Sequence, residues 1–163
     1  MPERVEWVSD DDWKTIVSSV PIVSVDLVVL SPAGVVFGYR TNEPAADQWF
    51  IPGGRVQKGE RLEEAVHRVA HEELGVDIEI RERLGVYEHL YETADVDTAG
   101  GKHYVPIGFV VETDVTDFKT DDQHNRIQVF SRDELPELHE YVEAYLRDGG
   151  LLDSGTRHVA DEL

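Results

Sequence analysis

The chain has 163 residues, of which 40% are hydrophobic and 30% are charged, and it contains no cysteine. This length suits one domain with a substantial core, and the lack of cysteine excludes disulfides and thiolate metal sites. A formal net charge of -19 argues against nucleic acid or an anionic membrane as a partner. No apolar run approaches a membrane span, and the first residues are acidic and polar, unlike a signal peptide. We therefore expect a cytoplasmic protein.

The acid excess is accompanied by few lysines, because only Lys14, Lys58, Lys102 and Lys119 are present among 15 basic residues. We interpret this composition as adaptation to high salt (a halophilic protein), where ions screen the repulsion between carboxylates. The alternative is an acidic protein that works at ordinary salt.

The first third of the chain predicts a helix followed by a hairpin. Ser9 precedes an acidic segment, 10–17, and this order is typical of a capped helix start. Turn residues at 31–34 separate two segments rich in β-branched residues. A third short strand ends at Pro52-Gly53-Gly54. The predicted strands cover residues 21–30, 35–40 and 49–51.

The rest of the chain predicts a central helix among strands. Residues 62–74 have helical periodicity, and Gly75 is a typical stop. Further strands are predicted at 78–91, 104–112 and 127–130, and a last helix at 133–146. The order of elements indicates an α+β or α/β sandwich. We expect one domain over 1–163, with a core of about 7–147 and a C-terminal tail without regular structure.

The central helix carries two carboxylates at its end. At about 100° per residue, one arc holds an apolar stripe, and Glu73 falls near the middle of that arc with Glu72 at its edge. The stripe consists of Leu62, Ala65, Val66, Val69 and Ala70.

Both carboxylates need compensation, because burial and the negative end of the helix dipole oppose them. Glu72 lies four residues after Arg68 and can pair with it. Glu73 has Val69 one turn before it, so a bound divalent cation is one explanation. The other is a rotated helix whose end leaves Glu73 in solvent.

The segment before the helix suits a diphosphate. Gly53 and Gly54 let the backbone approach a ligand closely, and Arg40 and Arg55 supply positive charge in an acidic protein. Taken alone, the glycine pair is equally consistent with an ordinary turn.

Together these residues resemble the Nudix box, in which Gly, five residues, Glu, seven residues and Arg-Glu-apolar-x-Glu-Glu-x-Gly-apolar follow one another. The matching positions here are Gly54, Glu60, Arg68, Ala70, Glu72, Glu73, Gly75 and Val76. The resemblance implies a Nudix fold, an α/β/α sandwich with a mixed β-sheet between helices. It also implies a hydrolase of nucleoside diphosphate derivatives that uses Mg²⁺ or Mn²⁺.

One box position departs from the pattern, because Val69 stands where the family has a Glu that binds metal or acts as the base. The flanks TNEPAADQWFIPGGRVQKGE and DDQHN are similar to the GDP-mannose mannosyl hydrolase branch, which lacks the same Glu and uses a His outside the box. This resemblance runs from about the first helix to Phe130.

Site residues follow from this resemblance. It implies His124 as the general base, with Arg40 and Arg55 stabilising the departing diphosphate. It places Asp26 and His89 near the sugar and Tyr104 near the diphosphate. The implied metal ligands are Gly53, Glu73 and Gln123, with Glu72 either a further ligand or only the partner of Arg68.

The implied reaction is hydrolysis of a GDP-mannose or GDP-glucose type of substrate, with water attacking C1 of the sugar and inverting it. The branch also implies a homodimer. Two alternatives stay open: a Nudix pyrophosphatase that cleaves a P–O bond, and a non-catalytic nucleotide-sugar sensor.

Overall fold

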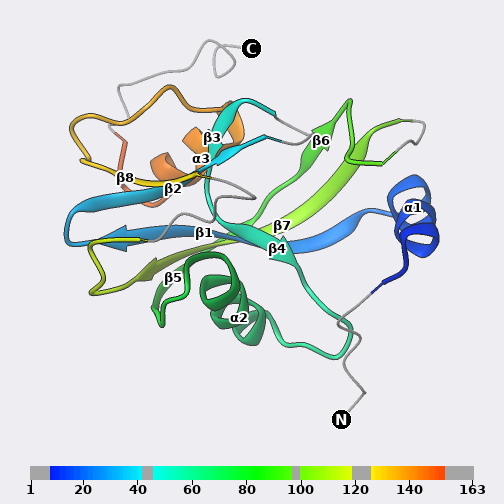
Figure 1. Ribbon diagram of the computed structural model, residues 1–163, viewed down its shortest axis with the longest axis horizontal. Coiled ribbons are helices and arrows are strands. Elements are labelled where there is room, and N and C mark those ends of the chain that lie inside the picture. The colour runs from blue at the N-terminus through cyan, green and yellow to red at the C-terminus, as the bar shows by residue number, and fades with distance from the viewer. Residues whose placement is uncertain (1–7, 42–45, 97–99, 119–125, 153–163) are drawn as a thin grey trace.

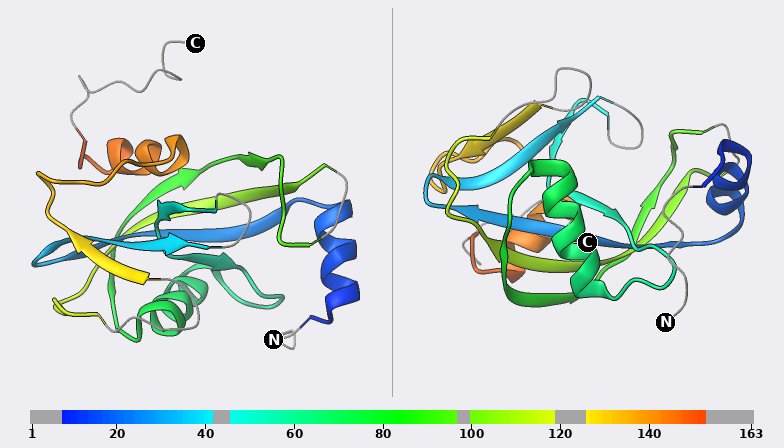
Figure 2. Two further views of the ribbon diagram at one scale, coloured as in Figure 1. Left: turned by 45° about the horizontal axis from the view of Figure 1, so that its top comes forward. Right: turned by 60° about the horizontal axis from the view of Figure 1, so that its bottom comes forward.

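The computed structural model describes residues 8–41, 46–96, 100–118 and 126–152. Within them, eight strands form one sheet, with helix α2 on one face and helix α3 on the other (Figure 1; Figure 2). The expected sandwich with a mixed sheet between helices is confirmed. Gln123 and His124 lie outside the described residues. None of the helices in the described part of the chain is long and apolar enough to cross a membrane.

The sheet has the order β3-β2-β1-β7-β5, and β4 pairs with β1, β6 with β7 and β8 with β2. β1 and β7 run parallel, whereas the other pairs among these strands are antiparallel. The helices are α1 (Asp10–Ser19), α2 (Leu62–Leu74) and α3 (Glu140–Asp148). The strands are β1 (Ile22–Ser31), β2 (Gly34–Arg40), β3 (Gln48–Phe50), β4 (Gly53–Arg55), β5 (Glu79–Val86), β6 (His89–Tyr91), β7 (Lys102–Glu112) and β8 (Arg126–Phe130).

Each face of the sheet packs against one helix through alternate residues of the same strands. Val25 and Leu27 of β1 join the core beneath α2, while Val28 of the same strand joins the core beneath α3. The predicted apolar stripe of α2 is confirmed, since Ala65, Val66, Val69 and Ala70 are buried and Leu62 packs against them. The α3 side is filled by Val142, Tyr145 and Leu146.

The predicted long strand at 78–91 is divided into β5 and β6, although its path is right. Val86 pairs with Ile107 and His89 with Tyr104, so the end of β5 and β6 share one register along β7, while β5 itself has two register shifts before this point. The ladder is interrupted at Tyr87, whose N–H donates to the Pro106 carbonyl at 2.8 Å. Proline has no N–H to return a bond, which explains the break.

Two other boundaries differ from prediction. The helix expected at 133–146 begins only at Glu140, because Pro136 disfavours helical geometry in the residue before it and has no N–H. His139 caps the helix instead, and its Nδ1 accepts from Tyr141 N–H at 3.0 Å. The segment expected only to end a strand forms a strand of its own, β4, paired with β1.

Candidate active site

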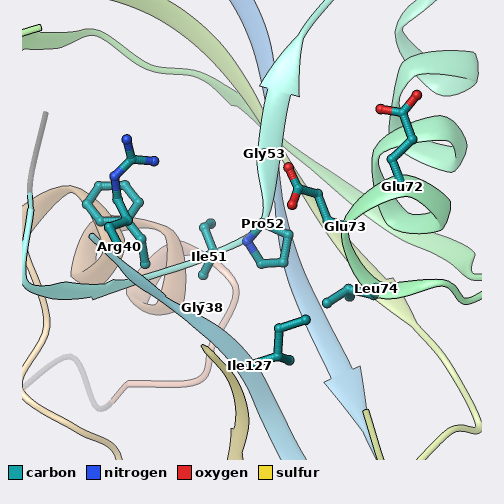
Figure 3. Close-up of a pocket in the computed structure, with 10 residues that line it drawn as sticks. Gly38, Arg40, Ile51, Pro52, Gly53, Glu72, Glu73, Leu74 and Ile127 are labelled. Atoms are coloured by element: carbon teal, nitrogen blue, oxygen red, sulfur yellow. The ribbon is translucent and has the colours of Figure 1, made fainter. Parts of the chain in front are cut away.

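Two adjoining pockets open beside β4. The large pocket, about 370 Å³, lies between the end of α2, β2 and the β3–β4 connection (Figure 3). The small pocket, about 90 Å³, lies between β1, β4, β6 and β7. Four of the lining residues are common to both pockets: Arg40, Phe50, Ile51 and Gly53. The two pockets therefore share a wall that includes Arg40.

Glu73 lies in the large pocket rather than in the core. Its side chain is exposed, and its carboxylate points toward Gly53 in Figure 3. The two explanations left open for Glu73 do not need burial among apolar residues, because the carboxylate is open to solvent in the pocket. The last turn of α2 faces the pocket and not the sheet, so the same helical face that buries Val69 presents Glu73 to a ligand.

Glu72 is oriented away from Gly53 (Figure 3) and its side chain is 61% exposed. Arg68 Nη1 donates to Glu72 Oε2 at 3.0 Å, as the spacing predicts. This ion pair gives the Glu72 carboxylate a partner on the outer surface of the helix. Glu72 nevertheless also lines the large pocket.

Arg68 also joins the loop before α2 to the sheet. Its guanidinium donates to the buried Glu60 carboxylate at 2.7 and 3.0 Å and to the Arg55 carbonyl at 2.8 Å. Glu60 Oε1 in turn accepts the Gln57 N–H at 3.0 Å. These bonds raise the pKa of Arg68, chiefly through Glu60. The Nudix-like spacing of Glu60 and Arg68 thus holds the loop, helix and strand in one arrangement.

Val69 belongs to the core and not to either pocket. It is 2% exposed, and a Cβ added to Gly54 would lie 3.0 Å from Val69 Cγ2. Gly54 is therefore needed for the close approach of β4 and α2. A base cannot act from the Val69 position in this arrangement, since the side chain is apolar and buried.

The large pocket offers oxygen ligands of the kind that a hard divalent cation takes. Mg²⁺ is commonly held by one or two carboxylates, with water and substrate phosphates completing its shell. The carboxylate of Glu73, directed toward Gly53, fits such a role, and the Gly53 carbonyl would be a second oxygen. Within the described ranges, no cluster of three or more acidic or histidine side chains forms a metal site. The described residues therefore fit a cation held partly by its substrate.

Two polar residues that line the small pocket, Asp26 and His89, contact the buried hydroxyl of Tyr145 behind it. Tyr145 Oη donates to Asp26 Oδ2 at 2.7 Å and lies 3.5 Å from His89 Nε2. Burial raises the pKa of Asp26 from 3.8 to about 6, opposed by the Tyr145 bond and the charge of Arg40. Burial, with a smaller effect of His139, lowers the pKa of His89 to about 4. At pH 7 the pocket thus presents a carboxylate beside a neutral imidazole.

Neighbouring side chains fix the walls of the small pocket. The His89 ring stacks on Tyr141, with centroids 4.1 Å apart and planes inclined by 4°. Tyr104 is contacted by Lys102, whose Nζ lies 5.0 Å from the ring centroid and binds Asp95 at 2.9 Å. Asp95 also accepts from the indole of Trp13, which ties α1 to this side of the sheet.

The structure brings most of the predicted site residues together. Arg40 and Gly53 line both pockets, and the predicted residues in one pocket only are Glu72, Glu73, Asp26, His89 and Tyr104. Arg55 lies at the end of β4, opposite Ser24, and is absent from the lining of these two pockets. Sequence reasoning missed Tyr145 and Tyr91. Tyr145 was missed because it falls on the apolar stripe of α3, where the spacing is typical of a residue that only packs in the core.

The family model for the NUDIX domain, which describes the sequences of that family, matches residues 20–148 of this chain. The chain belongs to the Nudix family. Hydrolases of this family generally use divalent metals such as Mg²⁺. The expectation of a Nudix fold is confirmed, and the general class of the protein is Nudix hydrolase.

Three relatives extend this comparison. The low-salt glycan biosynthesis protein Agl8 of Haloferax volcanii is 49% identical over 139 residues, or 85% of this chain and 88% of that protein. The ADP-ribose pyrophosphatase of Methanocaldococcus jannaschii is 31% identical over 118 residues, or 72% and 66%. Among solved structures, a MutT NUDIX hydrolase from Burkholderia pseudomallei matches with a TM-score of 0.62 and 26% identity. That match covers 78% of this chain and 97% of the other.

Proposed function

We propose that this protein hydrolyses a nucleoside diphosphate sugar, of the GDP-mannose or GDP-glucose type, to GDP and free sugar. Water attacks C1 of the sugar and inverts that centre, and the bridging oxygen leaves with the diphosphate. The observation that supports this proposal best is a pair of neighbouring pockets that both have Arg40 in their lining. One pocket offers carboxylate oxygens for a cation, and the other offers Asp26 and His89 for hydroxyl groups.

Charge complementarity assigns the ends of the substrate. The diphosphate lies at Arg40, with Tyr104 beside it, because a guanidinium at the junction of the pockets meets the negative charge that grows on the leaving group. We assign Arg55 to the same charge by the resemblance. The sugar occupies the small pocket, where the Asp26 carboxylate accepts and the His89 imidazole can donate or accept hydrogen bonds.

The base and the metal complete the proposal. His124 takes the proton from the attacking water, since an ordinary imidazole is neutral and basic near pH 7. Gly53, Glu73 and Gln123 hold Mg²⁺ or Mn²⁺, with Glu72 as a possible further contact, and the metal supplies positive charge at the diphosphate. The buried Val69 supports a base from outside the Nudix box. We also propose a homodimer, which sedimentation equilibrium tests.

The second candidate is a pyrophosphatase that cleaves a P–O bond. Glu72 and Glu73 at the large pocket and the similarity to an ADP-ribose pyrophosphatase favour it. The apolar side chain of Val69 opposes it, because a nucleophilic water at phosphorus usually needs stronger activation. The third candidate, a sensor, would bind nucleotide sugars without turnover at every metal concentration.

The deciding experiment is hydrolysis of GDP-mannose with Mg²⁺ in ¹⁸O-labelled water at high salt, followed by mass analysis of both products. Label in the free sugar is the expected result. Label in a phosphate identifies the pyrophosphatase, and no turnover across a panel of nucleotide sugars leaves the sensor. His124→Ala should then abolish most of the turnover, whereas His71→Ala, a change on the exposed face of α2, serves as its control.

A further inference from the structure

Tyr145 of α3 reaches the small pocket through the space left by a glycine. It is completely buried, and its ring lies against Gly108 of β7. A Cβ added to Gly108 would come within 2.7 Å of that ring. The absence of a side chain at Gly108 therefore allows the ring to lie closely over β7, on the α3 face of the sheet, and place its hydroxyl at Asp26 of β1.

The Tyr145 hydroxyl bonds to one carboxylate oxygen of Asp26, Oδ2. The other oxygen, Oδ1, lies on the side of Gly53 and the small pocket. Tyr145 Oη donates to Asp26 Oδ2 at 2.7 Å. Asp26 Oδ1 lies next to Gly53, where an added Cβ would be only 2.2 Å away. Gly53 lines both pockets and Asp26 lines the small one, and the Asp26 side chain keeps 14% of its surface exposed.

We propose that Tyr145 is a positioning residue, which holds Asp26 Oδ2 so that Oδ1 is presented to a hydroxyl group of the sugar. This inference rests on the proposed function and deepens it. It makes α3 a part of the site, although neither pocket includes a residue of that helix. The residue acts through Asp26 and does not itself touch the substrate.

The test compares Tyr145→Phe with Tyr87→Phe. The two rings pack together with centroids 4.4 Å apart, and both border Gly108. Tyr87 differs in its hydroxyl, which donates to Asp148 at 2.6 Å and not to Asp26. Each variant removes one tyrosine hydroxyl from this pair of rings, the Tyr87 hydroxyl being the more exposed of the two, so only Tyr145→Phe should change the position of Asp26.

Two readouts are measured on the full chain. Calorimetric titration in EDTA, where turnover does not intervene, compares the affinity for GDP-mannose with the affinity for GDP, which lacks the sugar. Tyr145→Phe should weaken GDP-mannose about threefold to tenfold and leave GDP unchanged, and kcat/KM with metal should fall by the same factor. Unchanged affinity for GDP-mannose, or an equal loss for both ligands, would overturn the proposal.

The two proposals fail in different ways. If GDP-mannose binds but is not turned over, the proposed hydrolysis fails, while the comparison of GDP-mannose with GDP still decides whether Tyr145 supports the sugar contact. In the Asp26→Ala background, which removes the acceptor of the Tyr145 hydroxyl, Tyr145→Phe should cause no further loss of activity or of GDP-mannose affinity. A further loss there would show that Tyr145 acts independently of Asp26, which also contradicts the proposal.

Discussion

Asp26 and His89 occupy one small pocket, yet burial moves their pKa values in opposite directions. Both shifts follow from the same cause, because removal from water disfavours the charged form of an acid and of a base alike. Asp26 nevertheless stays ionised at neutral pH, while His89 loses its charge. A pocket with one acceptor-only group and one neutral imidazole is suited to recognise hydroxyl groups, which both donate and accept.

The raised pKa of Asp26 predicts a cost to stability at neutral pH. Folded Asp26 holds its proton up to about pH 6, whereas the unfolded residue releases it near 3.8. Its contribution to the free energy of unfolding is therefore present at low pH and lost as the pH rises through this interval. Asp26→Asn, which can still accept from Tyr145, should gain about 1–3 kcal/mol at pH 8 and less at pH 5.

Urea unfolding at the two pH values measures this difference, with the exposed Asp133→Asn as the control. An equal effect of Asp26→Asn at pH 5 and pH 8 would contradict the shift. A loss of activity together with the gain in stability would agree with a functional carboxylate held at a cost to the fold.

At the scale of elements, the loop and helix of the Nudix box depend on Arg68. Its two acidic partners differ in burial, since the Glu60 side chain is fully buried and that of Glu72 is 61% exposed. Glu60→Gln should lower the free energy of unfolding by about 3 kcal/mol, because it leaves the partly buried guanidinium with only the exposed Glu72 as a charged partner. Glu72→Gln is the matched control and should cost less than about 1 kcal/mol. Chemical denaturation measures both, and equal costs would be inconsistent with this role of burial.

Val69 provides a second prediction for α2. Val69→Glu restores the typical family residue, but it places a carboxylate in a core position that Gly54 approaches closely. We expect destabilisation of about 3 kcal/mol or more and no gain in turnover. His71→Glu adds the same group to the exposed face of the helix and should be nearly neutral. Thermal unfolding of the two variants, with turnover assays, distinguishes them, and a stable and more active Val69→Glu would refute the core assignment.

The sequence predicts α2 correctly because its pattern is local: a stripe at helical spacing, then Gly75, whose φ of 69° suits glycine. It also brings Gly53, Glu72 and Glu73 to one pocket, because the Nudix spacing places them on β4 and at the end of α2. Three features depend on long-range geometry and could not be read locally. They are the exposure of Glu73, the approach of Tyr145 to Asp26, and the position of Arg55 outside both pockets.

At the scale of the whole molecule, the net charge of -19 acts on stability. Repulsion between carboxylates weakens the compact state, and salt screens it. We expect the melting temperature to rise by several degrees or more between 0.1 and 2 M KCl at pH 7.5. Near pH 4, where exposed Asp and Glu are about half protonated, the gain should be much smaller. A flat melting curve across KCl at pH 7.5 would argue for an ordinary acidic protein.

The parallel pairing of β1 with β7 also governs how the protein folds. It joins Ile22 to Tyr104 and Leu30 to Glu112, segments about eighty residues apart in the chain. Such pairing forms late, since a long loop must close before its contacts compensate the lost entropy. Asp26 and Tyr104 lie on these two strands, so the small pocket cannot exist in an early, locally folded intermediate. Recovery of ligand binding during refolding should therefore coincide with the slowest folding phase.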